Sequence, residues 1–263
     1  MTAGAGPKPE PGTSDAAVES VDPGQPFADA AHDSFALRRS RRHSVMVSLV
    51  LVAIAATLTV IMLIDPLQPW VQPFDDWWYR WIADHRTPWL TRVAEVLAFV
   101  GSGWVTFPLR LAIAALLAFR RRWTQLSAFV AAIVVSEFFI GPLKAIVDRP
   151  RPPRSLVDLT TPSFPSGHAI AAAVTAFGIV VAFLPRGRRR LAWIGGASFL
   201  AASMAWSRTY LAAHWATDTI AGICFGVAAA LLCEVAFEST RTVIAEHIPT
   251  QTDPTGGRVG SRE

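Results

Sequence analysis

The sequence predicts an all-α membrane protein, a bundle of six transmembrane helices with interfacial helices on the outer side. Of its 263 residues, 52% are hydrophobic, and the mean hydropathy is positive. A soluble domain of this length is rarely so apolar. The apolar residues also gather in separate runs, most of them near the ~20 residues that a helix needs to cross hydrocarbon. Ten Trp residues fit the preference of indole for the membrane interface.

Polar segments bound the apolar region at both ends. Residues 1–36 are rich in Ala, Gly, Pro, Asp and Ser and lack apolar periodicity, which predicts a disordered tail. No cleavage-like site follows the first apolar run, so we expect no signal peptide. Residues 248–263 predict a second disordered tail, which leaves 37–247 as the six-span domain. The apolar runs within it are 44–64, 103–119, 124–143, 166–184, 191–206 and 214–237.

Arginine clusters predict the orientation of the spans. They precede the first span and follow the second, fourth and sixth, so six spans place every cluster on one side. The positive-inside rule makes that side cytoplasmic. We therefore expect a multi-pass protein of the inner (plasma) membrane with both termini in the cytoplasm. This topology accounts for the net charge of +4, and we expect no nucleic-acid partner.

Cationic side chains suited to phosphate follow the third span and end the fifth. Lys144 lies at the outer end of the third span, and Arg151 follows in a loop that Pro150, Pro152 and Pro153 restrict. A restricted loop holds a guanidinium fork at small entropic cost. Arg208 ends the fifth span. Each alone is more simply explained as an interface residue that snorkels.

Two histidine motifs accompany these cations. Ser166 is a good N-cap for the fourth span, Gly167 allows a ligand close to the backbone, and His168 lies in the first turn beside this anion site. His214 and Asp218 are four residues apart at the start of the sixth span and would share one helix face. Such a carboxylate would fix the imidazole tautomer and free Nε2 for attack; the alternative is a buried structural hydrogen bond.

The three segments together resemble the tripartite signature of the type-2 phosphatidic acid phosphatases, in Lys144–Pro152, Pro165–His168 and Ser207–Asp218. The resemblance implies that His214 forms a phosphohistidine, that Asp218 supports it and that His168 protonates the leaving group. It implies that the phosphoryl oxygens are bound by Lys144, Arg151, Ser166, Gly167 and Arg208. It implies no metal and no cofactor, and an active site on the outer, periplasmic side.

This resemblance predicts a phosphatase for a lipid phosphate or diphosphate at the outer leaflet, with a polyprenyl diphosphate favoured as substrate. Phosphatidylglycerol phosphate and phosphatidic acid are the alternatives, because no motif distinguishes a prenyl from an acyl tail. A vanadate-dependent haloperoxidase has a related pocket, but the apolar runs argue against that soluble class. A non-catalytic lipid or anion binder or transporter is the third class. The sequence does not predict the oligomeric state.

Several features outside the motifs remain open at this point. Arg149 and Arg154 either meet a second phosphate or rim the pocket. Arg110 and Glu137, each about 10 Å deep by helix rise, are expected to pair. Gly222 and Gly226 favour packing within the chain over a dimer seam, and the two Cys are read as packing residues. An interfacial helix is expected from an aromatic stripe that either anchors it or walls the entry of a lipid: Phe74, Trp77, Trp78, Trp81 and Ile82, with Asp75, Asp76, Arg80 and Asp84 between.

Overall fold

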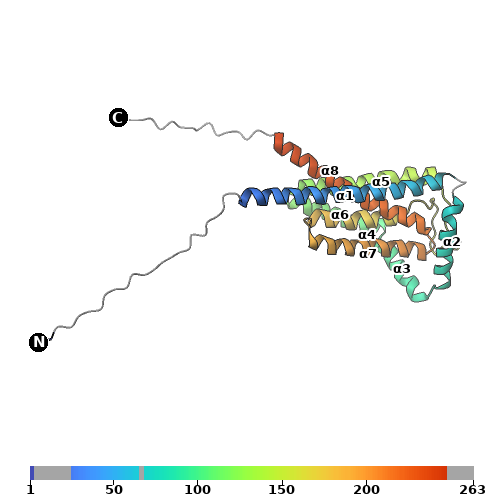
Figure 1. The fold of residues 1–263 in the computed structure, drawn as a ribbon. Helices are drawn as coiled ribbons and strands as arrows, with labels where there is room; N and C mark the ends of the chain where they lie inside the picture. The colour runs from blue at the N-terminus through green and yellow to red at the C-terminus, as the bar shows by residue number, and fades with distance from the viewer. Residues whose placement is uncertain (3–24, 65–67, 248–263) are drawn as a thin grey trace. The chain divides into compact units, whose positions relative to one another are not determined.

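The structure, a computed structural model, describes residues 1–2, 25–64 and 68–247. Its described residues are helical and contain no strand, as the sequence predicts. The helices are α1 (Gln25–Leu63), α2 (Gln68–Asp84), α3 (Pro88–Val100), α4 (Gly103–Phe119), α5 (Trp123–Val147), α6 (Gly167–Phe183), α7 (Arg188–Tyr210) and α8 (Ala216–His247) (Figure 1). The chain divides into two compact units at Arg39 and Ser40.

Helix α1 begins earlier than the sequence analysis expected. The predicted tail reached residue 36, yet the helix begins at Gln25. Pro26 stands in the first turn, where its missing N–H costs nothing, and the Ala-rich stretch after it favours helix. Residues 3–24 and 248–263 lie outside the described residues, so the rest of both predicted tails stays a prediction.

Three described helices are long and apolar enough to cross a membrane. They are residues 41–63 of α1, α5 and residues 216–240 of α8. Helices α3 and α4 pass the same test as a pair bent by 45°, which makes up to four spans, and α6 is a shorter apolar helix of 17 residues. Several apolar helices are therefore present among the described residues, and the count of six spans remains a proposal.

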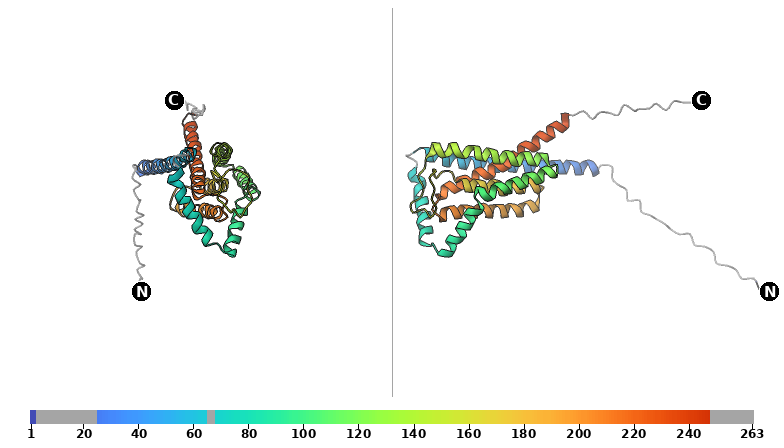
Figure 2. Two further views of the ribbon diagram at one scale, coloured as in Figure 1. Left: turned by 90° about the vertical axis from the view of Figure 1, so that its right-hand side faces the viewer. Right: turned by 180° about the vertical axis from the view of Figure 1, so that it is seen from behind.

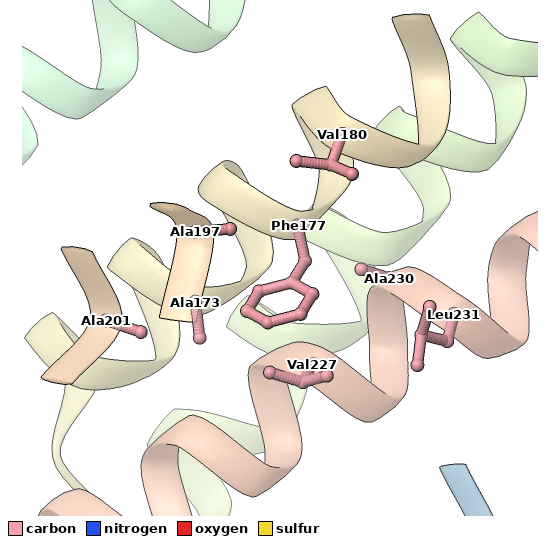
Figure 3. Packing of buried hydrophobic residues seen from close by; sticks show 8 residues of the cluster. All are labelled: Ala173, Phe177, Val180, Ala197, Ala201, Val227, Ala230 and Leu231. Carbon is pink, nitrogen blue, oxygen red and sulfur yellow. The ribbon is translucent and has the colours of Figure 1, made fainter. Parts of the chain in front are cut away.

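Helix α6 lies at the centre of the bundle. It packs most extensively against α8 and α7. Phe177 of α6 lies between Ala197 and Ala201 of α7 and Val227 of α8 in one buried cluster (Figure 3). The many alanines on α6 leave its neighbours room to approach closely.

Two glycines of α8 bring its backbone against α6. A Cβ on Gly222 would lie 2.8 Å from the Ser166 carbonyl oxygen, and one on Gly226 would lie 2.7 Å from that of Ile170. Only glycine permits such an approach. The G-x-x-x-G motif therefore packs within the chain, as expected. Cys224 and Cys233 are free, as expected.

Helix α2 crosses the end of the bundle at which α5 and α7 end and α6 and α8 begin (Figures 1 and 2). The sequence analysis expected one aromatic stripe on this helix, and the structure divides it between two faces. The outer face exposes Trp70, Phe74, Trp77 and Trp81, at helical spacing. The inner face packs Trp78 and Ile82 into a cluster with Tyr210 and Leu211.

The predicted pairing of Arg110 with Glu137 is confirmed. Nη1 of Arg110 on α4 lies 2.8 Å from Oε1 of Glu137 on α5. Arg110 also donates to the Thr175 hydroxyl (2.9 Å) and the Ala171 carbonyl (3.3 Å) of α6. The guanidinium is thus satisfied between three helices, which removes most of the cost of a charge at this depth.

Candidate functional site

The three sequence motifs meet at the end of the bundle that α2 crosses. The loop 148–166 between α5 and α6 lies against the turn 211–215 between α7 and α8. Backbone bonds join the two: the Leu156 N–H donates to the Leu211 carbonyl (2.9 Å), and the Ser166 N–H donates to the Asp218 carbonyl (3.1 Å). Residues that are 55 and 52 positions apart in sequence are thereby held together.

His214 lies in the turn before α8, so the expectation that it shares a helix face with Asp218 is wrong. Ala212 has a left-handed φ of 51°, and the N–H groups of Ala213 and His214 both donate to the Arg208 carbonyl, which closes the turn. Helix α8 begins only at Ala216. The imidazole nevertheless faces the carboxylate, with Nδ1 3.6 Å from Asp218 Oδ2.

The Asp218 carboxylate is fixed by donors on both oxygens. Oδ2 accepts from the Ser163 hydroxyl (2.5 Å) and the Trp215 N–H (2.9 Å), and Oδ1 accepts from Arg149 (2.6 Å). The bond from Trp215 is the return half of a capping box, in which the third helical residue binds the N-cap N–H. The carboxylate is completely buried, so this cage sets its direction.

The imidazole of His214 is held in its neutral form. Burial lowers its pKa to about 4, and the charges of Arg151 and Arg208 act in the same direction against the opposing effect of Asp218. Nη1 of Arg151 lies 3.4 Å from Nε2 of His214. A donor on that side favours a lone pair on Nε2 and the proton on Nδ1, toward Asp218.

The loop cations lie beside this histidine. Arg151 donates to the carbonyls of Thr161 (2.7 Å), Pro162 (3.3 Å) and Ala213, and Lys144 also donates to the Pro162 carbonyl. Burial lowers the pKa of Arg151, and the charge of Asp218 opposes this effect. The carbonyls hold both cations in place without neutralising them, because none carries a full charge.

Arg208 enters the site from the last turn of α7. It is 3% exposed, and its Nε has no hydrogen-bond partner among the described residues. A buried guanidinium nitrogen without an acceptor is costly unless an anion fills the place. His168 lies within electrostatic range of Arg208, His214 and Arg151, and its ring is close to Gly101 of the α3–α4 bend.

The start of α6 has the predicted form. Ser166 is the N-cap, and its side chain accepts from the Ala169 N–H (3.5 Å). A Cβ on Gly167 would meet nothing within 4 Å, so the space beside this backbone is free of protein. The unpaired N–H groups of a helix start favour an anion there.

A mainly apolar groove of about 590 Å³ leads away from Gly167 and His168. It runs between α4 and α5 over α6, and Arg110 and Glu137 lie in its wall. The site therefore continues into a groove with mostly apolar walls.

Sequence reasoning missed four polar groups of the site. Arg149 neither meets a second phosphate nor rims the pocket: it is 4% exposed and binds Asp218 and Asp75. Asp75 was assigned to the polar face of an interfacial helix, and it is completely buried. Ser163 and Thr217 complete the group. Arg154 is exposed. The run Arg149-Pro150-Arg151-Pro152 is the one sign of this cluster in the sequence, because it places two guanidinium groups on one restricted loop.

Comparisons with known proteins agree with this arrangement. Residues 125–241 match the sequence model of the PAP2 superfamily. Phosphatidylglycerophosphatase B of Bacillus subtilis (strain 168) is 30% identical over 150 residues, which cover 54% of this chain and 72% of that protein. The chain belongs to the PAP2 superfamily.

Two solved structures resemble this PAP2 protein. One is the first transmembrane PAP2 type phosphatidylglycerolphosphate phosphatase from Bacillus subtilis, with 22% identity and a TM-score of 0.61 over 78% of this chain and 98% of that chain. The other, Aquifex aeolicus LpxE, has 24% identity and a TM-score of 0.49 over 61% and 92%. The first likeness extends the shared fold beyond the matched motif region. The chain is a membrane lipid phosphatase of this superfamily.

Proposed function

We propose that this phosphatase hydrolyses a glycerophospholipid phosphate, such as phosphatidylglycerol phosphate or phosphatidic acid, through a phosphohistidine on His214. The observation that carries the proposal is a cluster of cations, Lys144, Arg151 and Arg208, of which Arg151 lies 3.4 Å from Nε2 of a neutral imidazole that faces a carboxylate on its other side. Cations bind the phosphoryl oxygens and stabilise the charge of the transferring group. The lone pair on Nε2 supplies the nucleophile.

The reaction has two steps. His214 Nε2 attacks phosphorus as the bond to the leaving oxygen breaks, and His168 gives a proton to that oxygen. Water then attacks the phosphohistidine, with His168 accepting its proton, and inorganic phosphate leaves. Asp218 supports the positive charge that the imidazole carries after the first step. Ser166 and Gly167 contribute the N-terminal amides of α6 to the phosphate site.

The burial of Arg149 favours a monophosphate over the polyprenyl diphosphate that sequence analysis preferred. A second phosphate needs cations of its own, and the candidates on the loop were Arg154, which is exposed, and Arg149. Its guanidinium is instead shared between two buried carboxylates. The name of the Bacillus relative points to the same substrate class.

The groove between α4 and α5 is the proposed path of the lipid tail. Its walls are mostly apolar, and it ends at Gly167 and His168, where the leaving oxygen would lie.

We further propose that six helices, α1 and α4 to α8, span a bacterial inner membrane. Both termini then lie in the cytoplasm, and α2 lies in the outer interface. The Trp-rich outer face of α2 supports that location.

Phosphate release from purified protein in detergent with EDTA tests the proposal. Phosphatidylglycerol phosphate, phosphatidic acid and a polyprenyl diphosphate are compared side by side, with His214→Ala as control. We expect faster release from the glycerolipids, no release by the variant, and an acid-labile phosphoenzyme in the wild type. Faster release from the polyprenyl diphosphate overturns the substrate assignment. Binding of lipid phosphate without release by a folded wild type overturns the enzyme mechanism.

A further inference from the structure

Asp75 is a buried carboxylate that none of the three motifs contains. It lies on the inner face of α2 and is completely buried. Its Oδ1 accepts from the Thr217 N–H (3.0 Å), and its Oδ2 accepts from the Thr217 hydroxyl (2.5 Å) and from Arg149 (2.7 Å). A carboxylate that accepts from this many donors is fixed in direction.

Arg149 joins this carboxylate to the one behind the nucleophile. Nη2 binds Asp75 and Nη1 binds Asp218 at 2.6 Å, so one planar guanidinium spans both. The ring of Trp215 covers the guanidinium, with 5.4 Å between its carbon and the ring centroid. Gln72 of α2 accepts from the same Nη2 (2.9 Å). The guanidinium therefore has no freedom to turn toward a substrate.

Thr217 is the second connection. It precedes Asp218 in the first turn of α8, and Asp75 binds both its N–H and its hydroxyl. The Thr217 hydroxyl in turn accepts from Arg149 Nη1 (2.9 Å). A carboxylate of α2 thus caps the helix that carries Asp218, and it favours that helix start electrostatically.

The charges of this cluster match the needs of the first chemical step. Two carboxylates and one guanidinium leave one net negative charge behind His214. The imidazole is neutral before the attack and positive once Nε2 carries the phosphoryl group. Fixed dipoles and charges that already face a developing charge stabilise it without reorganisation.

We propose that Asp75 is a positioning residue for the formation of the phosphohistidine. It acts through Arg149 and Thr217, which hold Asp218 against the imidazole of His214. This inference rests on the proposed function. It predicts that a helix outside the family's motifs contributes to the chemical step and not to lipid binding.

The test is Asp75→Asn, which keeps the size of the side chain and an acceptor for Thr217 but removes the charge. We expect kcat and the rate of phosphoenzyme formation to fall about 10- to 100-fold, with KM for the lipid phosphate changed less than about 3-fold. Asp84→Asn, at the exposed end of α2, is the matched control and should stay within about 2-fold of the wild type. Rapid-quench measurement of the phosphoenzyme separates formation from hydrolysis.

Thr217→Val is the second variant, for the case in which Asp75→Asn does not fold. It leaves all three charges in place and removes only the hydroxyl, so we expect a several-fold fall in kcat at unchanged KM. Phosphoenzyme formation at the wild-type rate by a folded Asp75→Asn or Thr217→Val protein refutes the positioning role. A rise in KM with kcat unchanged refutes it as well. A wild type that forms no phosphoenzyme with any lipid phosphate refutes the proposed function instead.

Discussion

Replacing Gly226 with Ala tests how closely α6 and α8 approach each other. The new Cβ would lie 2.7 Å from the Ile170 carbonyl oxygen, 2.8 Å from the Ala173 Cβ and 2.9 Å from the Val174 nitrogen. Ordinary contacts begin near 3.4 Å, so the helices must separate by about 0.7 Å. Two of the three atoms belong to backbone, which cannot move aside.

The size of the effect follows from this overlap. Overpacking of this kind costs about 1–3 kcal/mol, whereas Ala in place of Gly in a helix contributes up to about 1 kcal/mol in the opposite direction. Gly195→Ala in α7 reports the second term alone, because a Cβ there meets nothing within 4 Å. We expect the unfolding free energy of Gly226→Ala to lie about 1–3 kcal/mol below that of Gly195→Ala. At about 2–4 °C for each kcal/mol, this is a difference of several degrees in Tm.

Activity should follow the same displacement. Helix α6 carries His168 and α8 carries Asp218, so a separation of about 0.7 Å exceeds the ~0.5 Å within which catalytic groups must be held. We expect kcat of Gly226→Ala to fall on the order of 10-fold, while Gly195→Ala keeps wild-type activity. Thermal unfolding in detergent and phosphate release measure the two effects. Equal Tm and equal kcat for the two variants would show that the helices do not touch at Gly226.

Three further outcomes are expected. Gly167→Ala should leave Tm unchanged, because no protein atom lies within 4 Å of the new Cβ, and should raise KM for lipid phosphate several-fold; an unchanged KM means that phosphate does not approach this backbone. Arg110→Glu and Glu137→Arg should each lower the yield of folded protein, because each places two like charges together between α4 and α5, and the double variant should restore it; no recovery contradicts the pairing. Burial lowers the pKa of His214 from 6.5 to about 4, so the unfolded chain binds a proton that the folded chain does not, and stability falls as pH drops through this window. The Tm of the wild type should therefore fall more than that of His214→Asn between about pH 7 and about pH 4.5. An equal fall in both proteins would contradict the burial of a neutral imidazole.

The helices and the motif residues could be predicted because their signals are local. Apolar runs predicted α4 and α6 nearly at their observed bounds, although α1 begins earlier and α8 ends later than its apolar run. Motif spacing predicted that His168, Arg208 and His214 share one site. A capped start at Ser166 was readable from residue type alone, and it is confirmed. The pairing of Arg110 with Glu137 followed from the cost of isolated charge at depth, which no single helix can relieve.

The supporting cluster could not be predicted, because its signals are not local. Periodicity shows that α2 has an apolar stripe, but it does not show which part of the helix meets protein and which meets the surroundings. Asp75 therefore looked like a solvated residue, and Arg149 looked like a free cation. The capping bond of Asp218 to Trp215 likewise delays the start of α8 and places His214 outside it. Each of these depends on a partner that lies far away in the sequence.

Helix α2 has to satisfy two environments with a single register. Its outer face shows Trp70, Phe74, Trp77 and Trp81, and its inner face delivers Asp75 to Arg149. One residue inserted or deleted before Asp75 turns that side chain by about 100° about the helix axis. One bulky residue can thus replace another on the outer face of α2 without moving Asp75. A change in the length of the helix before Asp75 cannot be tolerated in the same way. Natural variation in α2 should consist of substitutions and contain no gaps, unlike the loop 85–87 that follows it.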